Sequence, residues 1–301
     1  MDARSSSPLA GQVALVTGCG KADGMGQAIA RALALDGARL VVTDKEPAGV
    51  ANDRQRRIGQ PGGGGLEVFA DALRADGCSV EIVLGDIADP AAAEAMVTAA
   101  IENFGQLDIL VNNAAAPQGA DRQDIEDVPL EVFDRVIDVN LRGTFHMCRA
   151  AVPHMRRRRY GRIVNIASMA GLTAAPSSVA YSASKAGVIG LTRALSMDLG
   201  PWGITVNALC PGLVATSRAI MDPSPDLDVE ETLRMRGRVI PVGRVGSTED
   251  IAAAARFLAS PQSGYITGQA LPIDGGGLTP FPLRHPASSE MPSENPKEKV
   301  L

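Results

Sequence analysis

The segment from Val13 to Gly26 reads VALVTGCGKADGMG and predicts the first unit of the fold. Its apolar and β-branched start, Val13–Thr17, is typical of a buried strand, and a helix is expected over Met25–Asp36. The glycines between them let the backbone turn tightly and approach a pyrophosphate, which the amino terminus of the helix attracts through its N–H groups and dipole. In this strand–turn–helix setting the turn indicates a dinucleotide site; the alternative is a plain connection.

The alternation of strands and helices continues along the chain and predicts a doubly wound α/β fold. Further strands are expected at Arg39–Thr43, Val80–Leu84, Ile109–Val111, Arg162–Ile166, Thr205–Leu209 and Ala270–Ile273. Helices are expected near Ala91–Phe104, Leu130–Met155, Val179–Leu199 and Thr248–Leu258, with an N-cap at Asp89 before Pro90 and a capping box at Ser247 and Asp250. Such continuous apolar strands form a parallel sheet of about seven strands with helices on both faces, and ligands bind at the carboxyl ends of its strands.

The chain is interpreted as one catalytic domain over residues 11–278 with four irregular segments. Residues 1–10 are expected to form a flexible tail. The glycine-rich stretch 47–66 predicts a flexible surface insertion, and residues 217–246 lack a clean periodicity and predict a mobile substrate lid. The last segment, 279–301, is rich in Pro, Ser and charge and predicts a loose tail.

Composition excludes several classes of function. A formal net charge of −5 gives no general attraction to nucleic acid or membrane, and 3% aromatic residues offer no surface for stacking bases. The start of the chain lacks an apolar signal core, and the dispersed cysteines are expected to be free thiols in the cytoplasm. No metal site is expected, because Cys19, Cys78, Cys148, Cys210, His146, His154 and His285 lack metal-ligand spacing.

Asp44 indicates which nicotinamide cofactor the site prefers. It ends the second predicted strand, where a carboxylate can accept hydrogen bonds from both ribose hydroxyls of an adenosine and repels a 2′-phosphate. This favours NAD over NADP, although Lys21 and Lys45 offer cations for a phosphate. Asp86, at the end of the third strand, is placed to contact adenine or, as the alternative, to begin the next helix.

The strongest catalytic signal is the sequence YSASK, from Tyr181 to Lys185. The two end residues are spaced i, i+4 and share one face of a helix. An ammonium near a phenol favours the phenolate, which turns a poor acid–base group into a usable one. Ser168, at the end of the preceding strand, has a hydroxyl that can hold the oxygen of a substrate beside Tyr181.

These motifs together resemble the short-chain dehydrogenase/reductase family, over roughly Gly11 to Gly277. The glycine turn, the NNAA sequence after the fourth strand, Asn140, Ser168, the Tyr181–Lys185 pair and the PGLVAT sequence from Pro211 to Thr216 all match family motifs. Two positions depart from the family pattern. More residues than usual, Cys19 to Asp23, separate Gly18 from Gly24, and Ala115 replaces a glycine.

The resemblance implies a Rossmann-type fold, a homotetramer, and an NAD-dependent enzyme that moves a hydride between its cofactor and a small secondary alcohol or ketone. It implies that Tyr181 transfers the proton, Lys185 assists it and binds the nicotinamide ribose, Ser168 orients the substrate, and Asn140 holds a relay water. The implied cofactor contacts are Gly18, Gly24, Met25, Gly26, Asp44, Asp86, Ile87, Asn113, Ala114, Tyr181, Lys185, Pro211, Gly212, Val214 and Thr216.

Two alternative functions stay open. The first is a 3-oxoacyl-thioester reductase using NADPH, similar to the 3-oxoacyl-carrier-protein reductases, in which Arg156–Arg159 would dock an acidic carrier protein or a coenzyme A phosphate. The competing interpretation of the arginines is a solvated helix end. The second is a non-catalytic nucleotide-binding scaffold on the same fold, which the complete set of catalytic residues disfavours. Substrate identity is expected to depend on residues 217–246, the loop after Ser168, and Ala116–Asp121.

Overall fold

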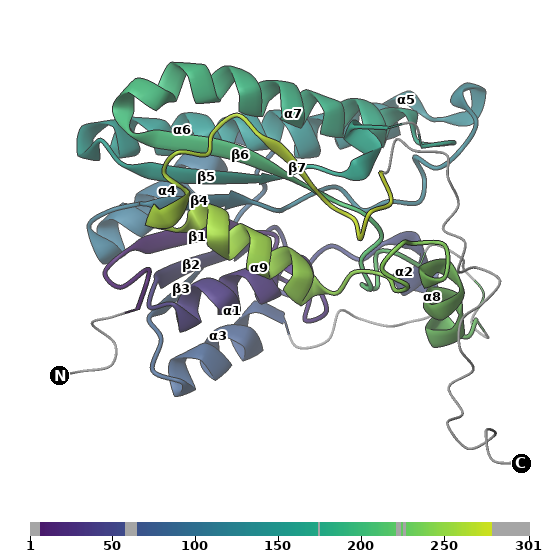
Figure 1. The fold of residues 1–301 in the computed structure, drawn as a ribbon, viewed down its shortest axis with the longest axis horizontal. Coiled ribbons are helices and arrows are strands. Elements are labelled where there is room, and N and C mark those ends of the chain that lie inside the picture. Colours follow the sequence, from purple (N-terminus) through teal and green to yellow (C-terminus); the bar gives the residue numbers. More distant parts are fainter. Residues whose placement is uncertain (1–6, 58–64, 174, 221–223, 225–226, 279–301) are drawn as a thin grey trace, which may run out of the picture.

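The structure, a computed structural model, describes residues 7–57, 65–173, 175–220, 224 and 227–278. Its seven parallel strands lie in the order β3-β2-β1-β4-β5-β6-β7 (Figure 1). The strands are β1 Val13–Thr17, β2 Arg39–Asp44, β3 Val80–Leu84, β4 Ile109–Asn112, β5 Gly161–Ile166, β6 Ile204–Pro211 and β7 Ala270–Ile273. The predicted doubly wound sheet is confirmed. After β3 the chain crosses back to pair β4 with β1, and this reversal opens a crevice at the carboxyl ends of β1 and β4.

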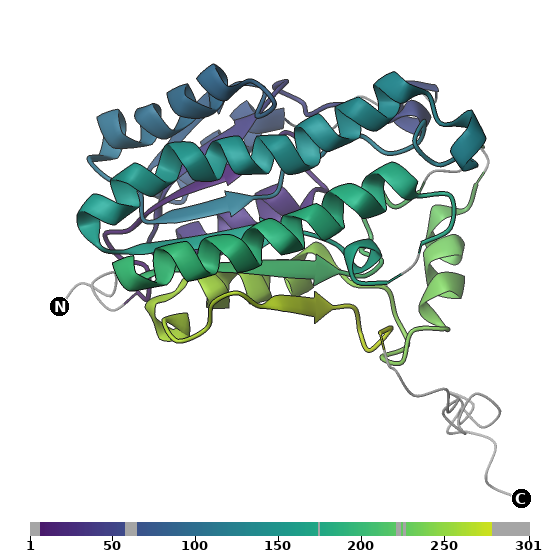
Figure 2. The ribbon, with the colours of Figure 1, turned by 90° about the horizontal axis from the view of Figure 1, so that it is seen from above.

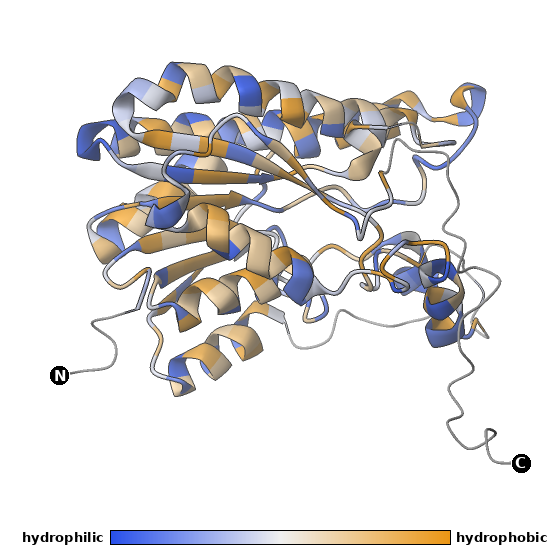
Figure 3. Ribbon diagram, in the orientation of Figure 1, coloured by the Kyte–Doolittle hydropathy of each residue, from blue (hydrophilic) through white to orange (hydrophobic). Residues whose placement is uncertain are grey.

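Helices cover both faces of the sheet because the strands are apolar on both sides. One face packs against α1 Met25–Leu35, α3 Gly65–Ala75 and α9 Thr248–Ala259, and the other against α4 Pro90–Phe104, α6 Thr144–Arg158 and α7 Val179–Leu199 (Figures 1 and 2). Figure 3 shows the strands as largely hydrophobic and the outlying helix α8, Val229–Gly237, as largely hydrophilic. The core therefore lies in two layers, one on each side of the sheet.

The predicted helix Leu130–Met155 is in fact two helices. Helix α5 ends at Ile137, a π-helical turn covers Asp138–Gly143, and α6 begins at Thr144. The apolar periodicity runs through the whole stretch, so the sequence pattern gave no sign of the wider turn. Such π turns occur mostly inside helices at functional positions, and this one carries Asn140.

Two irregular segments differ from their sequence interpretation. Leu9 is buried in the core and its N–H donates to the Asp36 carbonyl, so the predicted flexible tail 1–10 is shorter than expected. Part of the predicted surface insertion is also buried: residues 53–57 form helix α2, and Asn52 and Gln55 are shielded from solvent. The rest of that insertion, 58–64, and the tail 279–301 lie outside the described residues.

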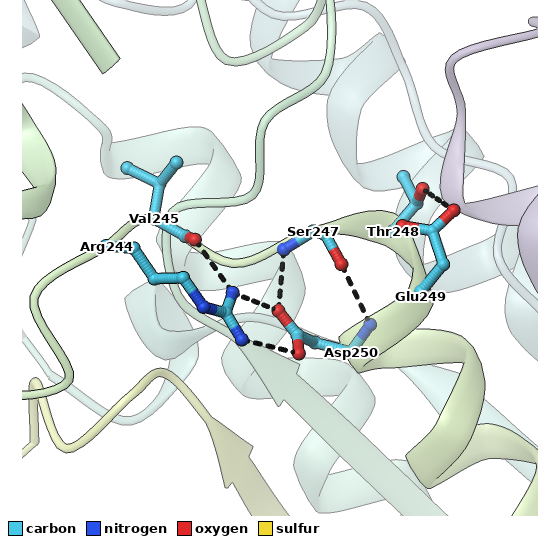
Figure 4. A network of polar contacts seen from close by, with 6 residues as sticks. All are labelled: Arg244, Val245, Ser247, Thr248, Glu249 and Asp250. Atoms are coloured by element: carbon cyan, nitrogen blue, oxygen red, sulfur yellow. Dashed lines mark hydrogen bonds and ion pairs between the residues drawn. The ribbon is translucent and has the colours of Figure 1, made fainter. Parts of the chain in front are cut away.

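Helix α9 begins with the predicted capping box, which is confirmed. The Asp250 N–H donates to Ser247 Oγ at 3.3 Å, and the Ser247 N–H donates back to Asp250 Oδ2 at 2.7 Å (Figure 4). Arg244 binds both oxygens of the same carboxylate, at 2.6 and 2.9 Å, and holds the pKa of Asp250 well below its usual range. The end of the lid segment is thereby fixed to the start of α9. The predicted N-cap at Asp89 is confirmed as well, since its side chain accepts from the Ala91 N–H.

The four cysteines are free, as predicted, with Cys19, Cys148 and Cys210 buried and Cys78 partly exposed. Within the ranges that the structure describes, none of the helices combines the length and apolar character that crossing a bilayer would need.

Candidate active site

A cavity of about 420 Å³ lies at the carboxyl ends of the strands and contains most of the predicted site. It is bounded by the glycine turn at one end and by the start of α7 at the other. The predicted residues that line it are Gly18, Gly24, Met25, Asp44, Asn113, Ala114, Ser168, Tyr181, Lys185, Pro211, Gly212, Val214 and Thr216. The predicted residues Gly26, Asp86, Ile87 and Asn140 lie behind or beside this wall.

The glycine turn is built for close approach of the backbone. Gly18 has a φ of +76°, which disfavours a side chain, and a Cβ on Gly26 would lie 2.2 Å from the Gly18 carbonyl oxygen. Asn113 Nδ2 donates to the carbonyls of Thr17 and Gly18 at 2.9 and 3.0 Å and so ties β4 to the turn. The glycines of the turn therefore leave the backbone open beside the amino terminus of α1, which fits a pyrophosphate.

Asp44 lies at the other side of this turn. Its Oδ2 accepts from the Gly20 N–H at 2.8 Å and its Oδ1 from the Lys45 N–H at 2.8 Å. Burial raises the pKa of Asp44 above its usual value, although these N–H groups oppose the shift. Asp86 is not among the residues that line the cavity; it pairs with Lys45 at 2.8 Å and accepts from the Ala88 N–H at 2.9 Å, while Asp89 is the residue that caps the next helix.

A cluster that we call the clasp joins three segments distant in sequence: the glycine turn, the insertion and the lid. The Ser217 N–H and Oγ both donate to the Asp23 carboxylate, the second at 3.1 Å. Gln55 Nε2 donates to Ser217 Oγ at 3.0 Å, and Asn52 Nδ2 donates to the Ser217 carbonyl at 3.3 Å. Lys21 donates to Gln55 Oε1 from the other side. The longer glycine turn is therefore the part that receives the lid.

The predicted catalytic residues Ser168, Tyr181 and Lys185 lie together at the end of the cavity beside α7, which we call the reacting end. Lys185 Nζ lies 5.7 Å from the centre of the Tyr181 ring and donates to the Ile166 carbonyl at 2.7 Å. Ser168, at the end of β5, lines the same cavity as both. Burial, and then the charge of Arg218, lower the pKa of Lys185 to about 7.

Asn140, which is buried behind the cavity wall, connects the π turn to α7 by a hydrogen bond. Its Nδ2 donates to Ser184 Oγ at 2.9 Å, and its Oδ1 accepts from the Ala116 N–H at 2.8 Å. Ser184 Oγ in turn donates to the Tyr181 carbonyl at 2.7 Å. This series of hydrogen bonds holds the first turn of α7 against the segment that follows β4. Asn140 itself does not line the cavity.

Sequence reasoning missed three arginines in the cavity wall, Arg122, Arg218 and Arg236. Arg218 is partly buried, and its guanidinium donates to the Ala115 carbonyl at 3.2 Å and to the Ala116 carbonyl. Arg122 lies over the Tyr181 ring, with its guanidinium carbon 5.2 Å from the ring centre. None of them stands in a recognisable motif; Arg218 and Arg236 fall in the predicted substrate segment 217–246, and Arg122 directly follows the segment Ala116–Asp121.

The run Arg156–Arg159 lies at the opposite edge of the sheet, because it ends α6 just before β5 begins. Arg158 pairs with Asp108 at 3.4 Å, Arg157 contacts His154, and Arg156 and Arg159 lie against the Trp202 ring. These contacts agree with the interpretation of the four arginines as a solvated helix end. The run lies at the edge where the strands begin, and the cavity lies at the edge where they end.

Comparison with known proteins gives consistent matches over most of the chain. A family model described as Enoyl-(Acyl carrier protein) reductase matches residues 18–277. The oxidoreductase UcpA of Escherichia coli (strain K12) is 36% identical over 275 residues, 90% of this chain and 96% of UcpA. A 3-oxoacyl-[acyl-carrier-protein] reductase of Synechocystis sp. is 36% identical over 270 residues, 89% of this chain and 97% of that protein. The crystal structure of levodione reductase superimposes with a TM-score of 0.80 at 31% identity and covers 91% of this chain and 100% of its own.

Proposed function

We propose a function that proceeds from the family of this chain. The matches establish that it belongs to the short-chain dehydrogenase/reductase family and is an oxidoreductase that uses NAD(P)(H). The proposed reaction is hydride transfer between NAD(H) and a secondary alcohol or ketone. The observation that carries it is the single cavity in which the glycine turn faces one end and Tyr181, Lys185 and Ser168 the other. When bound there, the nicotinamide supplies the hydride chemistry.

Each catalytic side chain has a role that its position supports. The Tyr181 hydroxyl takes the proton of an alcohol, or gives a proton to the carbonyl oxygen of a ketone. Lys185 lies beside the tyrosine, with its Nζ 5.7 Å from the ring centre, where it can bind the nicotinamide ribose. Ser168 orients the oxygen of the substrate by a hydrogen bond. Asn140 fixes the start of α7 through Ser184, and its buried place behind the cavity wall supports this positioning role more than the predicted contact with a relay water.

The proposed cofactor preference rests on Asp44. Its carboxylate lines the cavity at the adenosine side, where it can accept from ribose hydroxyls and repels a 2′-phosphate. Lys21 does not favour NADP strongly, because its amine is already engaged by Gln55, and burial lowers its pKa to about 8. Steady-state assays of a panel of secondary alcohols and ketones with NAD(H) and NADP(H), followed by the absorbance of the reduced cofactor, test this preference directly.

The general acid–base role is tested by Tyr181→Phe. We expect turnover to fall by about 10²- to 10⁴-fold, because the ring stays in place and only the transferable proton is lost. Binding of NADH, followed by its fluorescence, should change less than about twofold. Tyr160→Phe is the matched control, since its hydroxyl contacts Gln12 at the opposite edge. A Tyr181→Phe enzyme with most of its rate would assign the proton transfer elsewhere.

The alternative function, a 3-oxoacyl-thioester reductase using NADPH, keeps one supporting observation, the similarity to the Synechocystis enzyme of that name. The geometry supports it less, because the arginine run suggested for docking lies at the opposite edge with partners inside the chain. Inhibition of ketone reduction by acyl carrier protein would favour it. A non-catalytic scaffold is not favoured, because the complete catalytic set lies together.

We also propose that the enzyme acts in the cytoplasm as a homotetramer. Free cysteines support a reducing compartment. Exposed apolar side chains on the outer helices, among them Phe133, Phe145 and Val179, support contact with further copies. Sedimentation of the purified chain tests the assembly.

A further inference from the structure

Arg122 lies beside the catalytic tyrosine, with its guanidinium over the Tyr181 ring and its side chain in the cavity wall. Its Nε lies 3.9 Å from Asp121 Oδ2, too far for a hydrogen bond, and neither atom has another partner within the described part of the chain. The other Asp121 oxygen accepts from the Gly119 N–H at 3.0 Å. The two side chains therefore form a loose ion pair, and the Arg122 side chain stays 22% exposed beside Tyr181.

The charges around the cavity are unevenly distributed between its two ends. Among the described residues that line it, the carboxylates are Asp23 and Asp44, both at the end formed by the glycine turn. Asp23 accepts hydrogen bonds from the clasp and Asp44 from backbone N–H groups. The reacting end carries Arg122 and Arg218 in addition to Lys185. Asp121 pairs with Arg122 and Asp44 acts on Arg218, but the cations at this cavity, Arg236 among them, outnumber the carboxylates that offset them.

We propose, on the basis of the function proposed above, that the substrate carries a carboxylate which Arg122 binds next to Tyr181. A guanidinium matches a planar carboxylate through parallel hydrogen bonds, and that of Arg122 lines the cavity beside the Tyr181 ring. The enzyme is thus selective for keto acids and hydroxy acids over neutral ketones and alcohols.

Matched substrate pairs test this selectivity. We expect the wild type to reduce 4-oxopentanoate or 5-oxohexanoate with a kcat/KM at least tenfold above that of the corresponding methyl ester. In Arg122→Gln this preference should fall to about one, through a KM for the acid raised on the order of 10- to 100-fold. The kcat/KM for the ester should fall much less than that for the acid, which separates loss of carboxylate recognition from a general loss of activity. Arg122→Lys should retain part of the preference, since it keeps the charge and loses the planar fork.

Arg31→Gln is the control variant, because this arginine lies on α1 outside the cavity lining and, like Arg122, has a carboxylate at 3.9 Å and an aromatic ring beneath its guanidinium. It should keep the full preference for the acid. Circular dichroism of each variant separates loss of folding from loss of recognition. Equal use of acid and ester by the wild type, or a preference that survives in Arg122→Gln, would overturn the proposal. A stronger preference for dihydroxyacetone phosphate would replace the carboxylate by a phosphate and overturn it as well.

Binding measurements keep this test apart from that of the proposed function. If NADH binds and none of the ketones, acids or esters is reduced, the proposed reaction fails. The quenching of NADH fluorescence by 4-oxopentanoate then still reports on Arg122. Saturable quenching by the acid and not by the ester, lost in Arg122→Gln, supports the carboxylate site, and its absence in the wild type contradicts it.

Discussion

The two edges of the sheet use charged side chains in opposite ways. At the amino edge, the Asp108 carboxylate accepts from the Val13 N–H at 2.8 Å and from Gln106 at 2.6 Å, and pairs with Arg158. Arg162 donates there to the carbonyls of Gly161, Gly203 and Ser260. These groups bind the starts of the strands together, and their polar atoms have partners within the chain.

At the carboxyl edge the charges are only partly satisfied. Arg122 keeps a buried nitrogen without a partner, and Lys185 is buried with a carbonyl as its acceptor and no carboxylate within ion-pair distance among the described residues. Unpartnered buried polar atoms occur at the amino edge too, at Arg156 Nε and Thr205 Oγ1, so they do not by themselves mark the site. The edges differ in their ion pairing: Asp108 gathers backbone and charged donors where the strands begin, whereas Lys185 has only a carbonyl as its acceptor among the described residues where they end.

The largest effect that can sharpen this contrast is expected for Asp108→Ala. It leaves the Val13 N–H and Arg158 without their acceptor, so the free energy of unfolding should fall by about 2–4 kcal/mol in urea denaturation. Activity per folded molecule should stay the same. Arg158→Gln should cost less than about 1 kcal/mol, because that side chain is partly exposed. A loss of kcat in folded Asp108→Ala would break the separation of the edges.

The next effect concerns Lys185 and the pH dependence of stability. Its pKa is about 7 in the fold, against 10.5 for an ordinary exposed lysine, so the unfolded chain binds the proton more strongly between these values. Stability should therefore rise with pH over this range, by up to about 1.4 kcal/mol per pH unit, relative to Lys185→Met. Urea denaturation of both proteins from pH 7 to 10 measures the difference. If the free energies of unfolding of the two proteins changed in parallel with pH, the lowered pKa of the buried Lys185 amine would be contradicted.

The smallest of the three effects is expected at the clasp. Asp23→Ala removes the acceptor of Ser217, so the lid should close less tightly over the glycine turn. We expect the Kd for NADH to rise about tenfold, equivalent to about 1.4 kcal/mol, with the free energy of unfolding changed by less than about 1 kcal/mol. Glu249→Ala, an exposed change at the start of α9, serves as the control. Unchanged NADH binding would show that the clasp does not act on the cofactor.

The sequence predicted the sheet closely because its strands are short apolar runs between clear turn signals. It also predicted the Tyr181–Lys185 pair and the capping box at Ser247, since these depend on fixed spacings along one helix. It could not predict the π turn at Asn140, which follows from packing and leaves the apolar periodicity unchanged. Nor could it place Arg122 and Arg218, because their neighbours come from loops whose paths depend on the tertiary structure.

The hydrogen bond from Ser217 to Asp23 spans 194 residues of the chain, which bears on the order in which the protein matures. Contacts between such distant segments carry a high loop-closure entropy, so they form after the local strand–helix units that bring them near. During synthesis, the nucleotide crevice between β1 and β4 can therefore assemble well before its lid exists. The ability to retain a cofactor should therefore arise late, when the last third of the polypeptide folds onto the first third.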